Sequence, residues 1–163
     1  MRTQYFVQSD RTCHNKIRDK FIESIKPIIG VHATENTDYA RGVPKQLNTV
    51  IYVDNELLAV GNVLWRNRIY SDMEITKKNL YDHLVRWHEK NPDIPAFVIW
   101  GFGDKLDIRA WQFTPNEKYE PRTGGRYDRG DDLDVERVIA IPFSKLEVPK
   151  QIWRRAGILP ETA

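Results

Sequence analysis

The amino-acid sequence predicts an α/β (α+β) fold with a single central mixed β-sheet and two main helices packed against it. Amphipathic segments at helical spacing alternate with short runs of β-branched and aromatic residues. An apolar content of 40% is typical of a globular chain, and 163 residues suffice for one substantial core. We therefore expect residues 1–163 to form a single domain.

The first elements expected are a strand and a helix. Gln4–Gln8 has alternating apolar residues, which favour a short strand. In His14–Ile29 the apolar residues recur at helical spacing, and Pro27 and Gly30 mark the end of that helix. The polar segment 31–45 favours irregular structure.

A strand hairpin follows. Thr49–Val53 and Leu57–Trp65 are nearly continuous apolar runs, which indicate strands covered on both faces. Asp54–Glu56 favours a three-residue loop between them. With that loop, the register places Asn48 opposite Asn62 on one face, whereas a two-residue loop would put them on opposite faces.

The second half of the chain continues the alternation of helix and strand. Its expected elements are a helix at Ile75–Lys90, strands at Ala96–Phe102, Asp107–Phe113 and Glu136–Phe143, a long flexible loop at 114–134, and a C-terminal tail at 148–163 with a short basic helix at Lys150–Ala156. Pro142 indicates that the last strand lies at a sheet edge or ends there.

The order of helix, hairpin, helix and strand resembles the core of the PD-(D/E)XK nuclease superfamily, over roughly Ile17–Phe102. In that superfamily one strand carries an Asp and the next carries Glu-x-Lys. The acids hold Mg²⁺, and the lysine helps to orient the attacking water. The hairpin Gly42–Trp65 places Asn48 at the Asp position and Asn62-Val63-Leu64 at Glu-x-Lys. The resemblance implies a restriction-endonuclease-like core.

The resemblance also implies a candidate catalytic set. Its members are Glu23 as an acid on the first helix, Asn48, Asn62, and Lys77 as a displaced lysine. All three signature residues depart from the superfamily pattern, and an asparagine oxygen brings no charge to a metal ion. Three interpretations stay open: structural asparagines, a degenerate site retained for nucleic-acid binding, or a hydrolytic site with unusual residues. Mg²⁺ is the possible cofactor.

Basic residues supply the candidate nucleic-acid contacts. Arginines interleaved with aromatics and glycines suit phosphate contact and base stacking. The candidates are Arg41, Lys45, Arg66, Arg68, Arg122, Arg126 and Arg129. An ordinary charged surface is the alternative, because acids among residues 128–132 neutralise much of the long loop, and the net charge of +2 selects no partner.

The leading hypothesis is a nucleic-acid-associated protein of nuclease fold, catalytically degenerate or atypical, such as a phage or DNA-defence accessory protein. One alternative is a protein-interaction module or inhibitor that does not bind nucleic acid. A second is a small acyltransferase-like enzyme, since the stretch VDNELLAVGNV also resembles the central strands of such enzymes. The single cysteine, Cys13, excludes an intramolecular disulfide and favours the cytoplasm, and we expect no membrane span.

Overall fold

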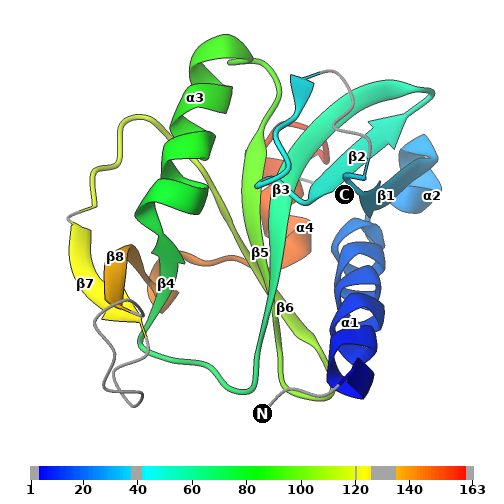
Figure 1. The fold of residues 1–163 in the computed structure, drawn as a ribbon. Coiled ribbons are helices and arrows are strands. Elements are labelled where there is room, and N and C mark those ends of the chain that lie inside the picture. Colours follow the sequence, from blue (N-terminus) through cyan, green and yellow to red (C-terminus); the bar gives the residue numbers. More distant parts are fainter. Residues whose placement is uncertain (1–3, 38–41, 120, 126–134, 161–163) are drawn as a thin grey trace.

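The computed structural model describes residues 4–37, 42–119, 121–125 and 135–160. Its helices are α1 (Gln4–Ile22), α2 (Lys26–Ile29), α3 (Asp82–Lys90) and α4 (Pro149–Arg155), with a π-helical turn η2 (Lys77–Tyr81) before α3 and a 3-10 turn η5 (Phe143–Lys145) before α4. Its strands are β1 (Val31–Glu35), β2 (Thr49–Val53), β3 (Glu56–Arg66), β4 (Asp72–Thr76), β5 (Ala96–Phe102), β6 (Asp107–Gln112), β7 (Pro121–Gly125) and β8 (Val135–Pro142) (Figure 1).

The centre of the fold is a five-stranded mixed sheet in the order β1-β2-β3-β5-β6. β3 and β5 are parallel, and the other neighbours are antiparallel. This arrangement confirms the predicted fold class. A second, three-stranded antiparallel sheet has the order β4-β8-β7, and the sequence did not lead us to expect it.

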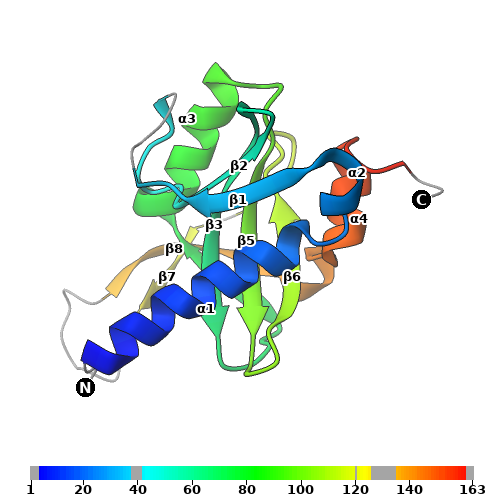
Figure 2. The ribbon, with the colours of Figure 1, turned by 90° about the vertical axis from the view of Figure 1, so that its right-hand side faces the viewer.

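The two faces of the five-stranded sheet carry separate hydrophobic clusters. Along β5 the side chains of Val98 and Trp100 join the cluster beneath α3 and the small sheet, whereas Phe97 and Ile99 join the cluster beneath α1 and α4. Figures 1 and 2 show α1 running across one face, with α3 on the other. Because β5 is buried along its whole length, its sequence is apolar without alternation.

Trp153 fixes the short helix α4 onto the α1 face. The side chain is fully buried, and its ring lies 4.8 Å from that of Phe21 and 5.1 Å from that of Phe97. Its indole Nε1 donates a hydrogen bond of 2.8 Å to the Phe21 carbonyl oxygen. This bond satisfies the one polar atom that the burial would otherwise leave without a partner.

Three segments differ from their predicted structure. Gln4–Gln8 begins α1 instead of forming a strand, because no glycine or proline separates it from the helical pattern that follows. Val31–Glu35 is an edge strand, and its two-residue alternation was hidden by polar outward positions. Asp72–Thr76 is also a strand, with Met73 and Ile75 buried, so the predicted helix at 75–90 starts only after it.

The predicted loop at 114–134 contains a strand, β7, which pairs with β8. Residues 126–134 lie outside the described part of the chain. Pro142 is the last residue of β8, as its missing N–H leads one to expect. Within the described residues, no helix is both long and apolar enough to cross a membrane.

Candidate functional site in the β2–β3 hairpin

The hairpin reaches its register by a route that differs from the predicted one. Asp54 and Asn55 have φ values of 50° and 67°, and Val53 pairs with Glu56, so the turn has two residues instead of three. A bulge between Ile51 and Tyr52 then shifts the pairing by one residue. As a result Thr49 pairs with Gly61, and the same register places residue 48 opposite residue 62.

The side-chain amide of Asn48 bonds to the backbone of β3 in the way that a paired strand residue does. Its Oδ1 accepts a hydrogen bond of 2.9 Å from the Val63 N–H, and its Nδ2 donates one of 3.3 Å to the Val63 carbonyl oxygen. The Thr49 hydroxyl donates a further bond of 2.9 Å to the same Oδ1. Asn48 therefore satisfies backbone groups of β3, and its oxygen already has two donors.

Asn62 lies opposite Asn48 in the hairpin register, and its side chain also bonds to the backbone. Its Nδ2 donates a hydrogen bond of 2.7 Å to the Gln46 carbonyl oxygen. Its Oδ1 is buried and has no hydrogen-bond partner among the described residues. Leu64, at the position expected for lysine, packs against the hydrophobic cluster beneath α3. Positions 48, 62 and 64 together thus offer one neutral oxygen without a partner among the described residues and no charged side chain.

The neighbouring residue on α1 is Arg18, which sequence reasoning missed. Its side chain is buried, with 3% of its surface exposed. Its Nε donates a hydrogen bond of 2.8 Å to Thr49 Oγ1, and its Nη1 donates one of 2.8 Å to Asn15 Oδ1. Its Nη2 donates a third, of 3.1 Å, to the Asn48 carbonyl oxygen. Among the described residues, all of its hydrogen bonds go to uncharged acceptors.

Burial lowers the pKa of Arg18, and the negative charge of Glu35 partly opposes that shift. The guanidinium nevertheless stays protonated, because the pKa of arginine starts far above neutrality. Glu35 itself lies 3.7 Å from Arg11. One signal in the sequence indicates the burial of Arg18: it precedes Phe21 and Ile22 by three and four residues, which places it on the buried stripe of α1.

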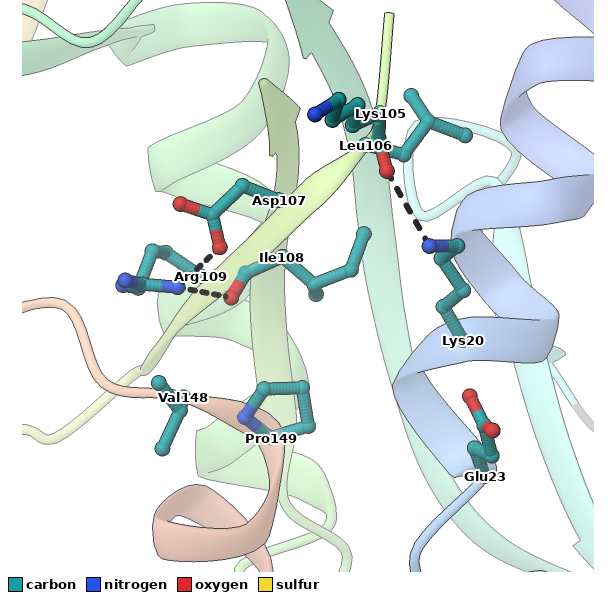
Figure 3. A pocket seen from close by; sticks show the side chains of 9 residues that line it. All are labelled: Lys20, Glu23, Lys105, Leu106, Asp107, Ile108, Arg109, Val148 and Pro149. Carbon is teal, nitrogen blue, oxygen red and sulfur yellow. Dashed lines mark hydrogen bonds and ion pairs between the residues drawn. The ribbon is translucent and has the colours of Figure 1, made fainter. Parts of the chain in front are cut away.

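The other two predicted catalytic residues lie elsewhere. Glu23 follows the end of α1, is exposed, and lines a shallow surface pocket of about 400 Å³ together with Lys20, Lys105 and Asp107 (Figure 3). Lys77 donates a hydrogen bond of 3.2 Å to Asp82 at the start of α3. Neither side chain contacts the two asparagines in any hydrogen bond or ion pair of the described residues.

The predicted nucleic-acid contacts divide into three groups. Arg41, Arg126 and Arg129 lie outside the described residues. Arg122 is held by Asp72, at 2.8 and 3.2 Å, and lies 3.6 Å from Glu74.

Lys45, Arg66 and Arg68 form the remaining group. Lys45 is exposed, and Arg66 donates a hydrogen bond of 2.8 Å to the Trp65 carbonyl oxygen. The guanidinium of Arg68 lies 4.7 Å from the ring centre of Tyr70, and no described acid forms an ion pair with it. The structure therefore brings none of these three to the asparagines through a hydrogen bond or ion pair of the described residues.

The donors of the hairpin do not fit Mg²⁺, the ion that the superfamily resemblance implies. Mg²⁺ requires oxygen ligands with negative charge among them, whereas the hairpin has two amides that bond to the backbone and a leucine. A buried cation, Arg18, lies against residues 48 and 49. Within the described residues, no three His, Cys, Asp or Glu side chains are grouped to hold a metal ion.

Comparisons with known proteins agree with the fold. A solved structure of a nuclease from a fusselovirus superposes with a TM-score of 0.52, covers 96% of this chain and 93% of that chain, and is 11% identical in sequence. A comparison with curated proteins finds no match. A family model described as "Phage putative PDDEXK endonuclease" matches residues 1–148. The chain therefore belongs to this phage family.

Proposed function

We propose that this protein binds nucleic acid on a nuclease fold and does not cut it by metal-assisted hydrolysis at the hairpin. The observation that carries the proposal is the pair of hydrogen bonds between the Asn48 amide and the Val63 backbone, together with the bond from Arg18 to the Asn48 carbonyl oxygen. Family membership makes nucleic acid the natural ligand. Its single cysteine and phage family fit action in the cytoplasm of an infected cell.

Hydrolysis at this position would need groups that the hairpin lacks. Metal-assisted cleavage relies on carboxylates to hold the ion and on a basic group near the attacking water. Both donors on Asn48 Oδ1 would have to leave before that oxygen could contact an ion. Glu23 and Lys77 cannot complete the site in this arrangement, because each lines or bonds to another part of the molecule.

The β3–β4 loop, residues 67–71, is the contact surface that we propose. Ile69 and Tyr70 are the large apolar side chains that this loop exposes, at 44% and 40%. Arg68 lies over the Tyr70 ring. A cation on an aromatic ring, next to an exposed aliphatic side chain, suits contact with one phosphate and stacking with one unpaired base. We therefore expect single-stranded nucleic acid to bind better than duplex.

Fluorescence anisotropy with labelled single-stranded DNA, duplex DNA and RNA tests this function. Affinity should fall steeply with added salt, because Lys and Arg contacts release counterions. Arg68→Ala should weaken binding and reduce the slope of log K against log salt by about one. Arg122→Ala is the matched control, since its charge is already held by Asp72. Binding that is absent or insensitive to salt would contradict the proposal and favour a protein-interaction module.

A further inference from the structure

Arg18 is a buried cation next to Asn48, the position where the resemblance leads one to expect a metal-binding acid. Its guanidinium reaches residue 48 through the backbone oxygen and residue 49 through the hydroxyl. A third bond returns to Asn15 on the same helix, so the planar group is held on three sides. With 3% of its surface exposed, water cannot screen its charge as it screens a surface arginine.

We propose that Arg18 is the resident cation of the hairpin, which holds α1 against residues 48 and 49 and keeps divalent metal ions out. The inference rests on the part of the proposed function that denies the hairpin a metal-dependent reaction. It adds a second reason for the hairpin not to bind a metal ion. Besides the missing carboxylates, the positive charge of Arg18 on α1 opposes metal binding.

Two features indicate that Arg18 excludes metal ions from the hairpin in addition to holding α1 in place. All hydrogen bonds of Arg18 to described residues end on neutral acceptors, so no carboxylate at contact distance cancels its charge. A second positive charge at the hairpin would be repelled across a poorly screened interior. The Thr49 hydroxyl, which accepts from Arg18 Nε and donates to Asn48 Oδ1, would link a carboxylate restored at position 48 to the guanidinium, whose charge would compete with a metal ion for it.

The sequence therefore contains a testable asymmetry. Restoring the acids alone should not restore a metal site, whereas restoring them and removing the charge of Arg18 should. The proteins to compare are the wild type, Asn48→Asp/Asn62→Glu, Arg18→Gln/Asn48→Asp/Asn62→Glu, and Arg18→Lys/Asn48→Asp/Asn62→Glu. The Lys variant keeps the positive charge and loses the planar fork.

Mn²⁺ binding, followed by electron paramagnetic resonance of the free ion and by calorimetry, is the direct readout. We expect no stoichiometric binding by the wild type, and affinity at least about tenfold tighter in the Gln triple variant than in the double or the Lys triple variant. Equal affinity in the double and the Gln triple variants would overturn the proposal. Tight binding of one Mn²⁺ by the wild type hairpin would overturn it as well.

A thermal measurement covers the case in which the Gln triple variant does not fold. A ligand that binds only the native state raises the melting temperature. The double variant should melt at the same temperature in millimolar Mn²⁺ and in EDTA, and a clear rise in Mn²⁺ would contradict exclusion by Arg18. None of these readouts uses nucleic acid, so failure to bind DNA or RNA would refute the proposed function alone.

Discussion

Two arginines of this molecule show how differently the same side chain can be used. Arg18 is buried and bonds to three neutral acceptors. Arg122, on the three-stranded sheet, has 48% of its side chain exposed and is held by Asp72 and Glu74. The sequence suggested a role for Arg122, which belongs to a series of arginines in one segment, and none for Arg18, whose bonded partners at residues 48 and 49 are distant along the chain.

The comparison separates structural from functional charge. The exposed ion pair of Arg122 contributes little to stability, since water and salt screen it. Removing Arg18 would take the donor from the buried Thr49 hydroxyl oxygen and one of the two donors from the Asn48 carbonyl oxygen. Arg18 is buried, and Arg122 is already paired with Asp72 and Glu74. Arg68, which stacks on Tyr70 without an ion pair to any described acid, is the better candidate for contact with a phosphate.

The largest effect is expected at Arg18. Arg18→Ala should lower the free energy of unfolding by about 3 kcal/mol, because three hydrogen bonds from a buried charge are lost together. Arg122→Ala should cost less than about 1 kcal/mol. Urea unfolding followed by tryptophan fluorescence measures both values. Equal losses in the two variants would contradict the distinction between the two arginines.

A smaller difference is expected between the two asparagines. Asn48→Ala should cost about 2 kcal/mol, since it leaves both the N–H and the carbonyl of Val63 without their partner. Asn62→Ala removes one bond, to Gln46, and should cost about 1 kcal/mol. The same denaturation experiment ranks the two losses. The reverse order would show that the Asn48 hydrogen bonds contribute less to stability than their geometry indicates.

The smallest effect on stability, and a clear effect on binding, is expected in the β3–β4 loop. Tyr70→Ala should change the free energy of unfolding by less than about 0.5 kcal/mol, because the ring is partly exposed. Its affinity for single-stranded DNA should fall by about 1 kcal/mol, the contribution of one stacked base. Tyr70→Phe, which keeps the ring, is the control. Unchanged affinity in the Ala variant would exclude this loop as a stacking platform.

Most of the fold could be predicted from periodicity. The apolar runs at β2, β3 and β5 identified the centre of the sheet, since a strand buried on both faces has no polar alternation. The edge strand β1 and the strand β4 were missed, because short half-exposed strands carry few apolar residues. That residues 1–163 form a single domain stays a prediction.

The site was predictable only in part. The positions of Asn48 and Asn62 follow from the hairpin, but their register depended on a two-residue turn and a bulge that compensate each other. No local pattern announces such a bulge. The role of Arg18 depends on contacts 30 and 31 residues away along the chain, which only the packing of α1 on the hairpin reveals.

The central claim is that this nuclease fold binds nucleic acid without a divalent metal ion and leaves it intact. The most direct test measures the affinity for single-stranded DNA at constant ionic strength in Mg²⁺ and in EDTA, and then the length of the recovered strand. The account predicts the same affinity in both buffers and an uncut strand. Binding that requires Mg²⁺, or a shortened strand that depends on it, would contradict the account.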